Sequence, residues 1–323
     1  MTVRVYSSTD ASAPVLTGQV GSLIAVLDAC LVNGYGTKTA AGWTKPFADA
    51  SNTAVYRSGS GSRAFFRFFD DGTATTQGAR VCQILGYSTM SDISTGTLTT
   101  SSSTSALTYV WKSSSADATP RPWRVIATNK GCYIVIQNNM GSPFPKSFVG
   151  YFGDYVSYDP SITTTNYGIW MGSNASFSVS STTQGLLLNG FFPSASSAAM
   201  PTHANGSTRN CVFFLGSAGG LSLNNTQSAW TSSSGYSLIT TPSNGVLLLS
   251  PVYIMEGTGL ESSRCLGHLP GLFKPLMQVA GDQTEVELTG GPYNGKKFMS
   301  VRVLADTVDS FWSMLVETTS NGW

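Results

Sequence analysis

Two carboxylates lie close together in a run of aromatic residues. Asp154 and Asp159 belong to the segment YFGDYVSYDP, in which Tyr151 and Tyr158 stand beside them. A pair of carboxylates can cleave a glycosidic bond, one acting as acid and the other as base or nucleophile. Aromatic neighbours are typical of sugar contacts, so these four residues are candidate glycan contacts. The alternative, which we favour, is a strand edge packed with Tyr and Phe.

The other reactive side chains show no catalytic or metal-binding spacing. Glu256 and Glu261 are further acid candidates, but the sequence around Glu256 is typical of a turn that ends a strand. The only two histidines, His203 and His268, are far apart, whereas a metal site needs several ligands at set spacings. A Ser-His-Asp triad stays open, although the chain has no G-x-S-x-G elbow. We therefore expect no enzyme activity, no metal and no cofactor, with glycan cleavage as the remaining alternative.

The charge balance argues against polyanionic partners. The chain has 18 Lys and Arg against 17 Asp and Glu, and charged residues make up only 11% of it. Binding to a nucleic acid backbone needs clustered Lys and Arg, and an anionic membrane attracts a polybasic patch. We expect neither partner. A neutral, hydroxyl-rich surface suits a subunit that packs against neighbours, and a plain Ser/Thr-rich β protein is the alternative.

The N-terminus and the cysteines predict synthesis in the cytoplasm. The apolar run Leu23–Val32 starts too late for a signal peptide and carries Asp28. No apolar run approaches the roughly 20 residues that span a bilayer. The five cysteines are isolated and form no CxxC pair, so we expect reduced thiols rather than a disulfide framework or a structural zinc site.

One strong helix signal occurs near the N-terminus, at about residues 20–33. Leu23, Leu27 and Leu31 recur at helical spacing, and Asn33-Gly34 can end the helix in a left-handed conformation. We therefore expect a core-packing amphipathic helix. The loop that follows is a candidate subunit contact through Tyr35, Trp43 and Phe47.

Short strand-like segments separated by turn signals fill the rest of the chain. Residues 54–69 predict two strands joined by the Gly/Ser turn SGSGS, and Asp70-Asp71-Gly72 predicts a further turn. The clearest hairpin starts at Trp123 and turns at Asn129-Lys130-Gly131. This pattern, without βαβ alternation, predicts a mainly β fold. We expect antiparallel sandwich or barrel-like sheets with the single N-terminal helix.

Composition divides the chain into three regions. Residues 1–172 are expected to form an N-terminal β region that includes the helix, and residues 246–323 a C-terminal β region that completes the fold, in one or two domains. Residues 173–245, low in charge and rich in Ser, Asn, Gly and Ala, are expected to be a loop-heavy insertion. Within the last region, RCLGHLPGLFKPL at 264–276 is predicted to be a loop.

Several blocks in a common order resemble a family of virion structural proteins from tailed bacteriophages. The resemblance extends from residue 3 to residue 323 and is weakest at 173–245. The blocks are VYSSTDASAPVLTGQVGSLIAVLDACLVNGYG, AAGWTKPF, GYSTMSDISTG, KSSSADATPRPWRVIATNKGCYIVI, YFGDYVSY, LLLSPVYIMEG, RCLGHLPGLFKPL and LVETTSNGW.

The resemblance implies a component of the virion rather than an enzyme. We predict a tail or baseplate subunit in a symmetric ring, because closed symmetry is the usual way in which identical copies bury such surfaces. A capsid decoration or cement protein is one alternative, and a module that binds or cleaves a host surface glycan is another. The expected partners are copies of the chain and other virion proteins. Candidate interface residues are Tyr35, Trp43, Phe47, Leu269, Leu272, Phe273 and Trp323.

Overall fold

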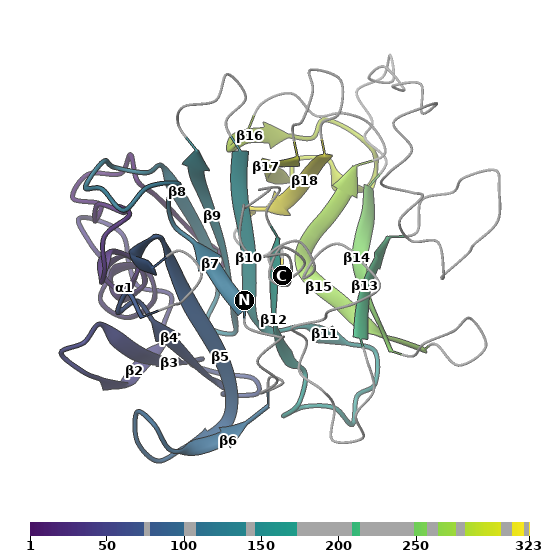
Figure 1. Cartoon of the computed structure of the whole chain (residues 1–323). Helices are drawn as coiled ribbons and strands as arrows, with labels where there is room; N and C mark the ends of the chain where they lie inside the picture. The colour runs from purple at the N-terminus through teal and green to yellow at the C-terminus, as the bar shows by residue number, and fades with distance from the viewer. Residues whose placement is uncertain are drawn as a thin grey trace.

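Strands dominate the described part of the chain, and they form three antiparallel sheets (Figure 1). Within that part, no helix is long and apolar enough to cross a membrane. The computed structural model describes residues 1–73, 78–99, 108–139, 146–172, 209–213, 249–256, 264–275, 282–304, 312–319 and 323.

Each sheet draws on one main region of the chain. The central sheet contains, in spatial order, β1 (Arg4–Ser7), β8 (Trp123–Ala127), β9 (Gly131–Asn139), β10 (Lys146–Asp154) and β12 (Tyr167–Gly172). The N-terminal sheet contains β2 (Thr44–Ala48), β3 (Thr53–Arg57), β4 (Phe65–Phe69), β5 (Val81–Met90) and β6 (Gly96–Leu98), with β7 (Thr108–Trp111) also paired to β5. The C-terminal sheet contains β13 (Arg209–Phe213), β14 (Leu249–Glu256), β15 (Arg264–Pro275), β18 (Trp312–Glu317), β17 (Lys297–Leu304) and β16 (Thr284–Glu287), with β11 (Val156–Ser157) also paired to β15.

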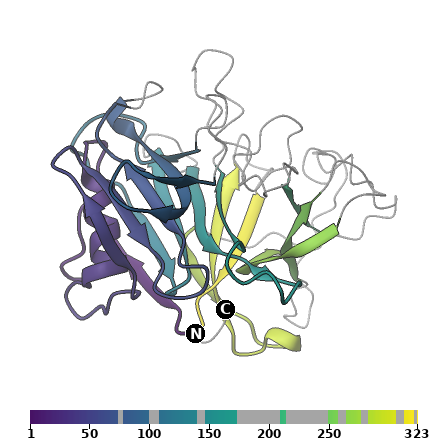
Figure 2. The ribbon, with the colours of Figure 1, turned by 90° about the horizontal axis from the view of Figure 1, so that it is seen from below.

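The central sheet lies between the other two, so that both of its faces are buried (Figure 2). Along β9, Cys132, Ile134 and Ile136 pack toward the helix and the N-terminal sheet. Tyr133 and Val135 alternate with them and pack toward the C-terminal sheet. A strand buried on both faces has apolar residues at every position, which explains the uninterrupted run CYIVI.

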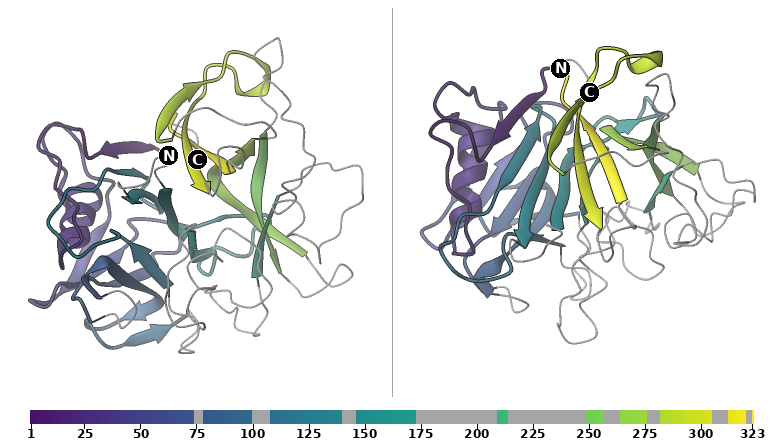
Figure 3. Two further views of the ribbon diagram at one scale, coloured as in Figure 1. Left: turned by 45° about the horizontal axis from the view of Figure 1, so that its top comes forward. Right: turned by 90° about the horizontal axis from the view of Figure 1, so that it is seen from above.

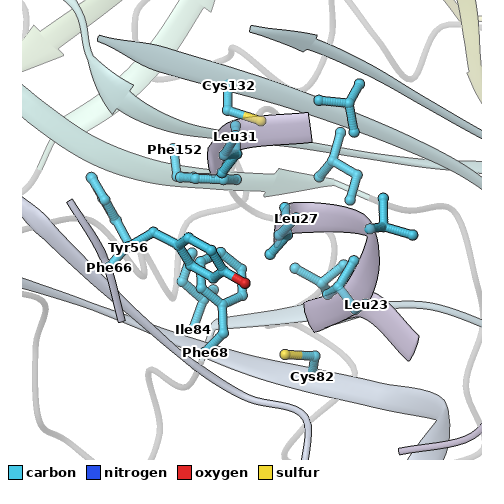
Figure 4. Packing of buried hydrophobic residues seen from close by; sticks show 14 of the residues in the cluster. Leu23, Leu27, Leu31, Tyr56, Phe66, Phe68, Cys82, Ile84, Cys132 and Phe152 are labelled. Atoms are coloured by element: carbon cyan, nitrogen blue, oxygen red, sulfur yellow. The ribbon is translucent and has the colours of Figure 1, made fainter. Parts of the chain in front are cut away.

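The predicted helix is confirmed, but only its first half is an α-helix. α1 (Ser22–Leu27) continues directly into a π-helical segment, η1 (Asp28–Asn33), which Gly34 ends by donating its N–H to the carbonyl of Ala29. The predicted inward-facing residues are fully buried between the N-terminal and central sheets (Figure 4). They are Leu23, Leu27 and Leu31.

Both predicted hairpins are confirmed. β3 and β4 pair across the SGSGS loop at 58–62, and β8 and β9 pair across the Asn129-Lys130-Gly131 turn. The fold class is also confirmed as mainly antiparallel β with one N-terminal helix. In the described strands the sheets are open and layered, and none of them closes into a barrel.

The predicted loop at 264–276 is wrong, because this segment forms β15. The ladder between β14 and β15 is interrupted after the pair Tyr253 and His268, and it resumes at Pro251 and Phe273. Gly271, with φ +65°, lies in this irregularity. Pro270 lies there too, at a position where the ladder requires no backbone N–H, which proline lacks. Pro270 and Gly271, which from sequence suggest a loop, therefore belong to a bulge within one long strand.

The N-terminal and C-terminal regions share one apolar cluster. Tyr133 and Trp170 of the central sheet pack with Leu269, Val301 and Val316 of the C-terminal sheet. Figure 3 shows the same two sheets side by side from two further directions. Of the predicted insertion at 173–245, the described part is β13, which pairs with β14, and the other residues lie outside the described part.

Candidate functional site

A cavity of about 580 Å³ lies where loops of the three sheets meet. Its lining includes Gly61 from the β3–β4 loop, Lys130 from the β8–β9 turn and Pro270 from the β15 bulge. Asp154 at the end of β10 and Asn166 before β12 complete its polar wall. Both chain ends contribute, since Met1 and Trp323 line it, and the two ends lie close together in Figure 2.

Asp154 joins the N-terminal sheet to the central sheet at this cavity. The side chain is 6% exposed, and its Oδ2 accepts a hydrogen bond of 2.9 Å from the backbone N–H of Ser62. The hydroxyl of Ser62 donates to Oδ1, so one serine engages both carboxylate oxygens. Burial raises the pKa of Asp154 to about 6, although the hydrogen bonds from Ser62 and the charge of Lys130 oppose this rise.

Glycine at position 61 permits this contact. Gly61 has φ +72°, and a Cβ at this position would lie 1.9 Å from Oδ2 of Asp154. A side chain would therefore be strained and would also collide with the carboxylate. The SGSGS loop, which from sequence resembles a plain turn, has a backbone conformation that accommodates Asp154.

The four candidate glycan contacts do not form one group. Tyr151, Asp154 and Asp159 line the cavity, whereas Tyr158 is 51% exposed and forms a 3.0 Å hydrogen bond with Nδ1 of His268 outside it. Tyr151 is fully buried, and its hydroxyl donates to the carbonyl of Asp154. Oδ1 of Asp159 accepts hydrogen bonds from the N–H (2.9 Å) and hydroxyl (2.6 Å) of Ser161 in its own turn.

The remaining acid and histidine candidates do not extend this site. Glu261 and His203 lie outside the described residues, and Glu256 is the last residue of β14. His268 lies in β15, and burial lowers its pKa. Among the described residues, no three His, Cys, Asp or Glu side chains form a group that could hold a metal ion.

Three of the predicted interface residues belong to the interior of the chain, which corrects that prediction. Trp43, Leu269 and Leu272 are at most 3% exposed. The indole of Trp43 donates a 2.7 Å hydrogen bond to the carbonyl of Thr128, and its ring contacts Phe152 with a centroid separation of 5.5 Å. A loop aromatic anchors this chain to itself, and the sequence alone does not distinguish that role from a subunit contact.

The other four interface candidates are partly exposed, and each contacts its own chain. The hydroxyl of Tyr35 donates to Asp10 over 2.8 Å. Phe47 and Phe273 pack at the borders of two small apolar clusters. The role of these residues between subunits stays a prediction.

Trp323 is docked on the C-terminal sheet and the central sheet. Its indole N–H donates to the carbonyl of Glu317 over 3.0 Å, and its ring meets Tyr133 edge-on with centroids 5.2 Å apart. A Cβ on Gly271 would lie 2.2 Å from the indole nitrogen, so glycine there makes room for the tryptophan.

The sequence analysis missed a buried ion pair beside the helix. Asp70 and Lys112 have fully buried side chains and form a salt bridge. Asp70 also accepts a 2.8 Å hydrogen bond from the N–H of Leu23 in the first turn of α1, where Gly21 supplies no side-chain cap. Burial raises the pKa of Asp70 to about 6, and Lys112 opposes this rise. A sequence signal for such a buried acceptor was Gly21, which begins the helix without a side chain that could cap its N–H groups.

Two comparisons with known proteins found no match for this chain. No model of a known protein family matches the chain, and no curated protein sequence matches it.

Proposed function

We propose that the chain is a non-enzymatic structural component of a tailed-phage particle, most specifically a tail or baseplate subunit in a symmetric ring. The structural role is supported by the contacts of the two buried carboxylates, those of Asp70 and Asp154. Asp70, which follows β4, pairs with Lys112 and joins the N-terminal sheet to the helix by accepting the N–H of Leu23. Asp154 joins two sheets through Ser62. Both carboxylates connect elements of the fold.

The place in a particle is supported by the sequence blocks that resemble virion proteins and by the nearly neutral composition. With a net charge of +1, little repulsion keeps copies apart, and closed rings bury such surfaces efficiently. A capsid decoration protein would need the same properties. The two places differ in copy number, which is low in a baseplate ring and high on a capsid.

The direct test is to label this chain in assembled particles of a phage that encodes it. A tag at an exposed turn, followed by gold labelling and electron microscopy, is expected to mark the tail or its distal end. A label spread over the head would favour the decoration alternative. Particles that lack the chain altogether, together with a recombinant monomer that binds no virion protein, would contradict every particle role.

Binding of a host glycan is a second candidate, and the cavity is the observation that favours it. Tyr151, Asp154 and Asp159 lie along its wall. Hydrogen bonds from Ser62 and Ser161 already engage the two carboxylates, so this candidate concerns contact with a sugar rather than cleavage. Unchanged phage adsorption after combined Asp154→Asn and Asp159→Asn substitution would dismiss it.

A further inference from the structure

The N-terminal sheet has an outer face that the helix and the central sheet do not cover. Tyr56, Phe66 and Phe68 point from β3 and β4 into the core. Val55 and Phe65 alternate with them and belong to a separate small cluster. The residues of this outer face, as defined by cross-strand pairing, are Phe47, Val55, Arg57, Phe65, Arg67, Phe69, Leu85, Tyr87 and Leu98.

Two arginines lie flat over phenylalanine rings on this outer face. The guanidinium of Arg57 is 4.7 Å from the ring centroid of Phe65, and that of Arg67 is 4.1 Å from the ring centroid of Phe69. The pairs Arg57–Phe65 and Val55–Arg67 are successive rungs of the β3–β4 ladder on this face, which makes the two arginines diagonal neighbours. Stacking on the rings holds each guanidinium in place.

The described residues supply these arginines with no counter-charge. Arg63, in the exposed β3–β4 loop, accepts a 3.2 Å hydrogen bond from Nε of Arg57 through its carbonyl and adds a third positive charge. Within the described residues no ion pair includes any of the three arginines. Nε of Arg67 is shielded from solvent and has no hydrogen-bond partner there. Burial and the charge of Arg63 lower the pKa of Arg57.

Nearby carboxylates are engaged elsewhere. Asp49 in the β2–β3 turn accepts hydrogen bonds from the N–H groups of Ser51 and Thr53. Asp92 in the β5–β6 turn accepts them from Ser94 and Thr95. The outer face therefore combines fixed guanidinium groups with partly exposed apolar side chains, a combination that suits an anionic partner.

We propose that this outer face docks an acidic segment of another protein, whose carboxylates pair with Arg57, Arg63 and Arg67 while its apolar side chains contact the partly exposed Phe47, Leu85 and Leu98 at the border of the small cluster. The proposal rests on the proposed function, because it specifies the chemistry of a neighbour in an assembly. Planar guanidinium groups pair with carboxylates through two parallel hydrogen bonds, and such charge-assisted bonds are among the strongest at interfaces.

Two other occupants fit the outer face less well. A second copy docked by the same face across a two-fold axis would bring six guanidinium groups together, two sets of three. A nucleic acid would meet only this small basic cluster on a chain whose net charge is +1, whereas polyanion binding depends on many phosphate contacts.

The test uses the whole chain, a Glu-rich peptide that contains Phe, and a matched peptide with Gln in place of Glu. The wild type is expected to bind the Glu peptide and not the Gln peptide in low salt. The double substitution Arg57→Gln/Arg67→Gln is expected to weaken binding about tenfold or more, because it removes two charge-assisted pairing groups. Arg63→Gln, in the exposed loop, is a second variant that leaves the stacked pairs in place, and Arg124→Gln on β8 is the matched control.

Each outcome decides the proposal. Equal binding of both peptides, or full binding by both the double variant and Arg63→Gln while Arg124→Gln behaves as wild type, would overturn it. Stronger binding of a DNA oligonucleotide than of the Glu peptide would assign the face to a polyanion, and arginine-dependent dimers in sedimentation would assign it to a second copy. Either would also overturn it. If the arginine variants enter phage particles normally, the docking proposal fails while the structural role stands, whereas absence of the wild-type chain from particles contradicts the structural role.

Discussion

Asp70 and Asp154 are both buried aspartates whose pKa burial raises to about 6, yet their surroundings differ. Asp70 faces the ammonium group of Lys112 in a fully buried pair beside α1. Asp154 borders a cavity and is held by the neutral donors of Ser62. The first carboxylate is stabilised mainly by a buried counter-charge, the second mainly by hydrogen bonds from Ser62, with a smaller contribution from the charge of Lys130. The same residue type therefore connects elements in two ways that should respond differently to mutation and to pH.

The largest effect is expected from Lys112→Met. This change removes the counter-charge and leaves Asp70 buried with the N–H of Leu23 as a remaining donor. Loss of one partner of a buried ion pair destabilises a protein by about 3–5 kcal/mol, which urea denaturation would measure. The double variant Asp70→Asn/Lys112→Met should recover part of the loss, because no buried charge remains. A loss below about 1 kcal/mol in the single variant would contradict the counter-charge as the main stabiliser of Asp70.

The next effect concerns pH and Asp154. Its folded pKa of about 6 lies above the ordinary 3.8, so between these values the folded protein holds a proton that the unfolded chain has released. This contribution to stability is complete below about pH 4 and is lost as the pH rises through 6. Asp154→Asn should flatten the decline in the free energy of unfolding between these pH values by about 3 kcal/mol, since one pKa unit corresponds to about 1.36 kcal/mol.

Two features make this pH experiment specific. Asp70 titrates in the same range in the wild type and in the Asp154→Asn variant, so the difference between their profiles isolates Asp154. Asp159→Asn is the matched control, since Asp159 lines the same cavity but is held in its own turn by Ser161. Identical profiles for the wild type and Asp154→Asn would show that Asp154 is not buried as described.

The smallest effect is expected from Ser62→Ala, which removes one of the two donors to Asp154 and keeps the backbone N–H. Because the hydroxyl stabilises the charged form, its loss should raise the pKa of Asp154 further. It should also destabilise the fold at pH 7 by about 1–2 kcal/mol. NMR titration of the Asp154 carboxyl carbon measures the first effect. An unchanged pKa would mean that the backbone N–H alone holds the carboxylate.

Local patterns predicted much of the secondary structure. Helical spacing predicted the segment at 20–33, and turn chemistry predicted the β3–β4 and β8–β9 hairpins. The same reasoning failed for β15, because Gly and Pro signal a loop and a bulge equally well until the paired strand is known. It also assigned Trp43 to a surface, since an aromatic residue in a loop carries no sign of the core that receives it.

The candidate site was predicted only in part. The segment from Tyr151 to Asp159 drew attention through its composition, and three of its four candidates do line the cavity. The partner of Asp154 lies 92 residues away at Ser62, and that of Asp70 lies 42 residues away at Lys112. No local spacing relates such pairs.

The sequence by itself determined the mainly antiparallel β class, the N-terminal helix and the near-neutral charge, because these depend on residue type and short-range periodicity. Only the tertiary structure decided which carboxylates became buried and whether a serine or a lysine contacts each of them. It also decided that the arginines on the outer face of the N-terminal sheet have no carboxylate partner among the described residues. These properties depend on the stacking of three sheets, which brings distant segments together and removes water from selected side chains. Desolvation then gives two ordinary aspartates their unusual pKa values.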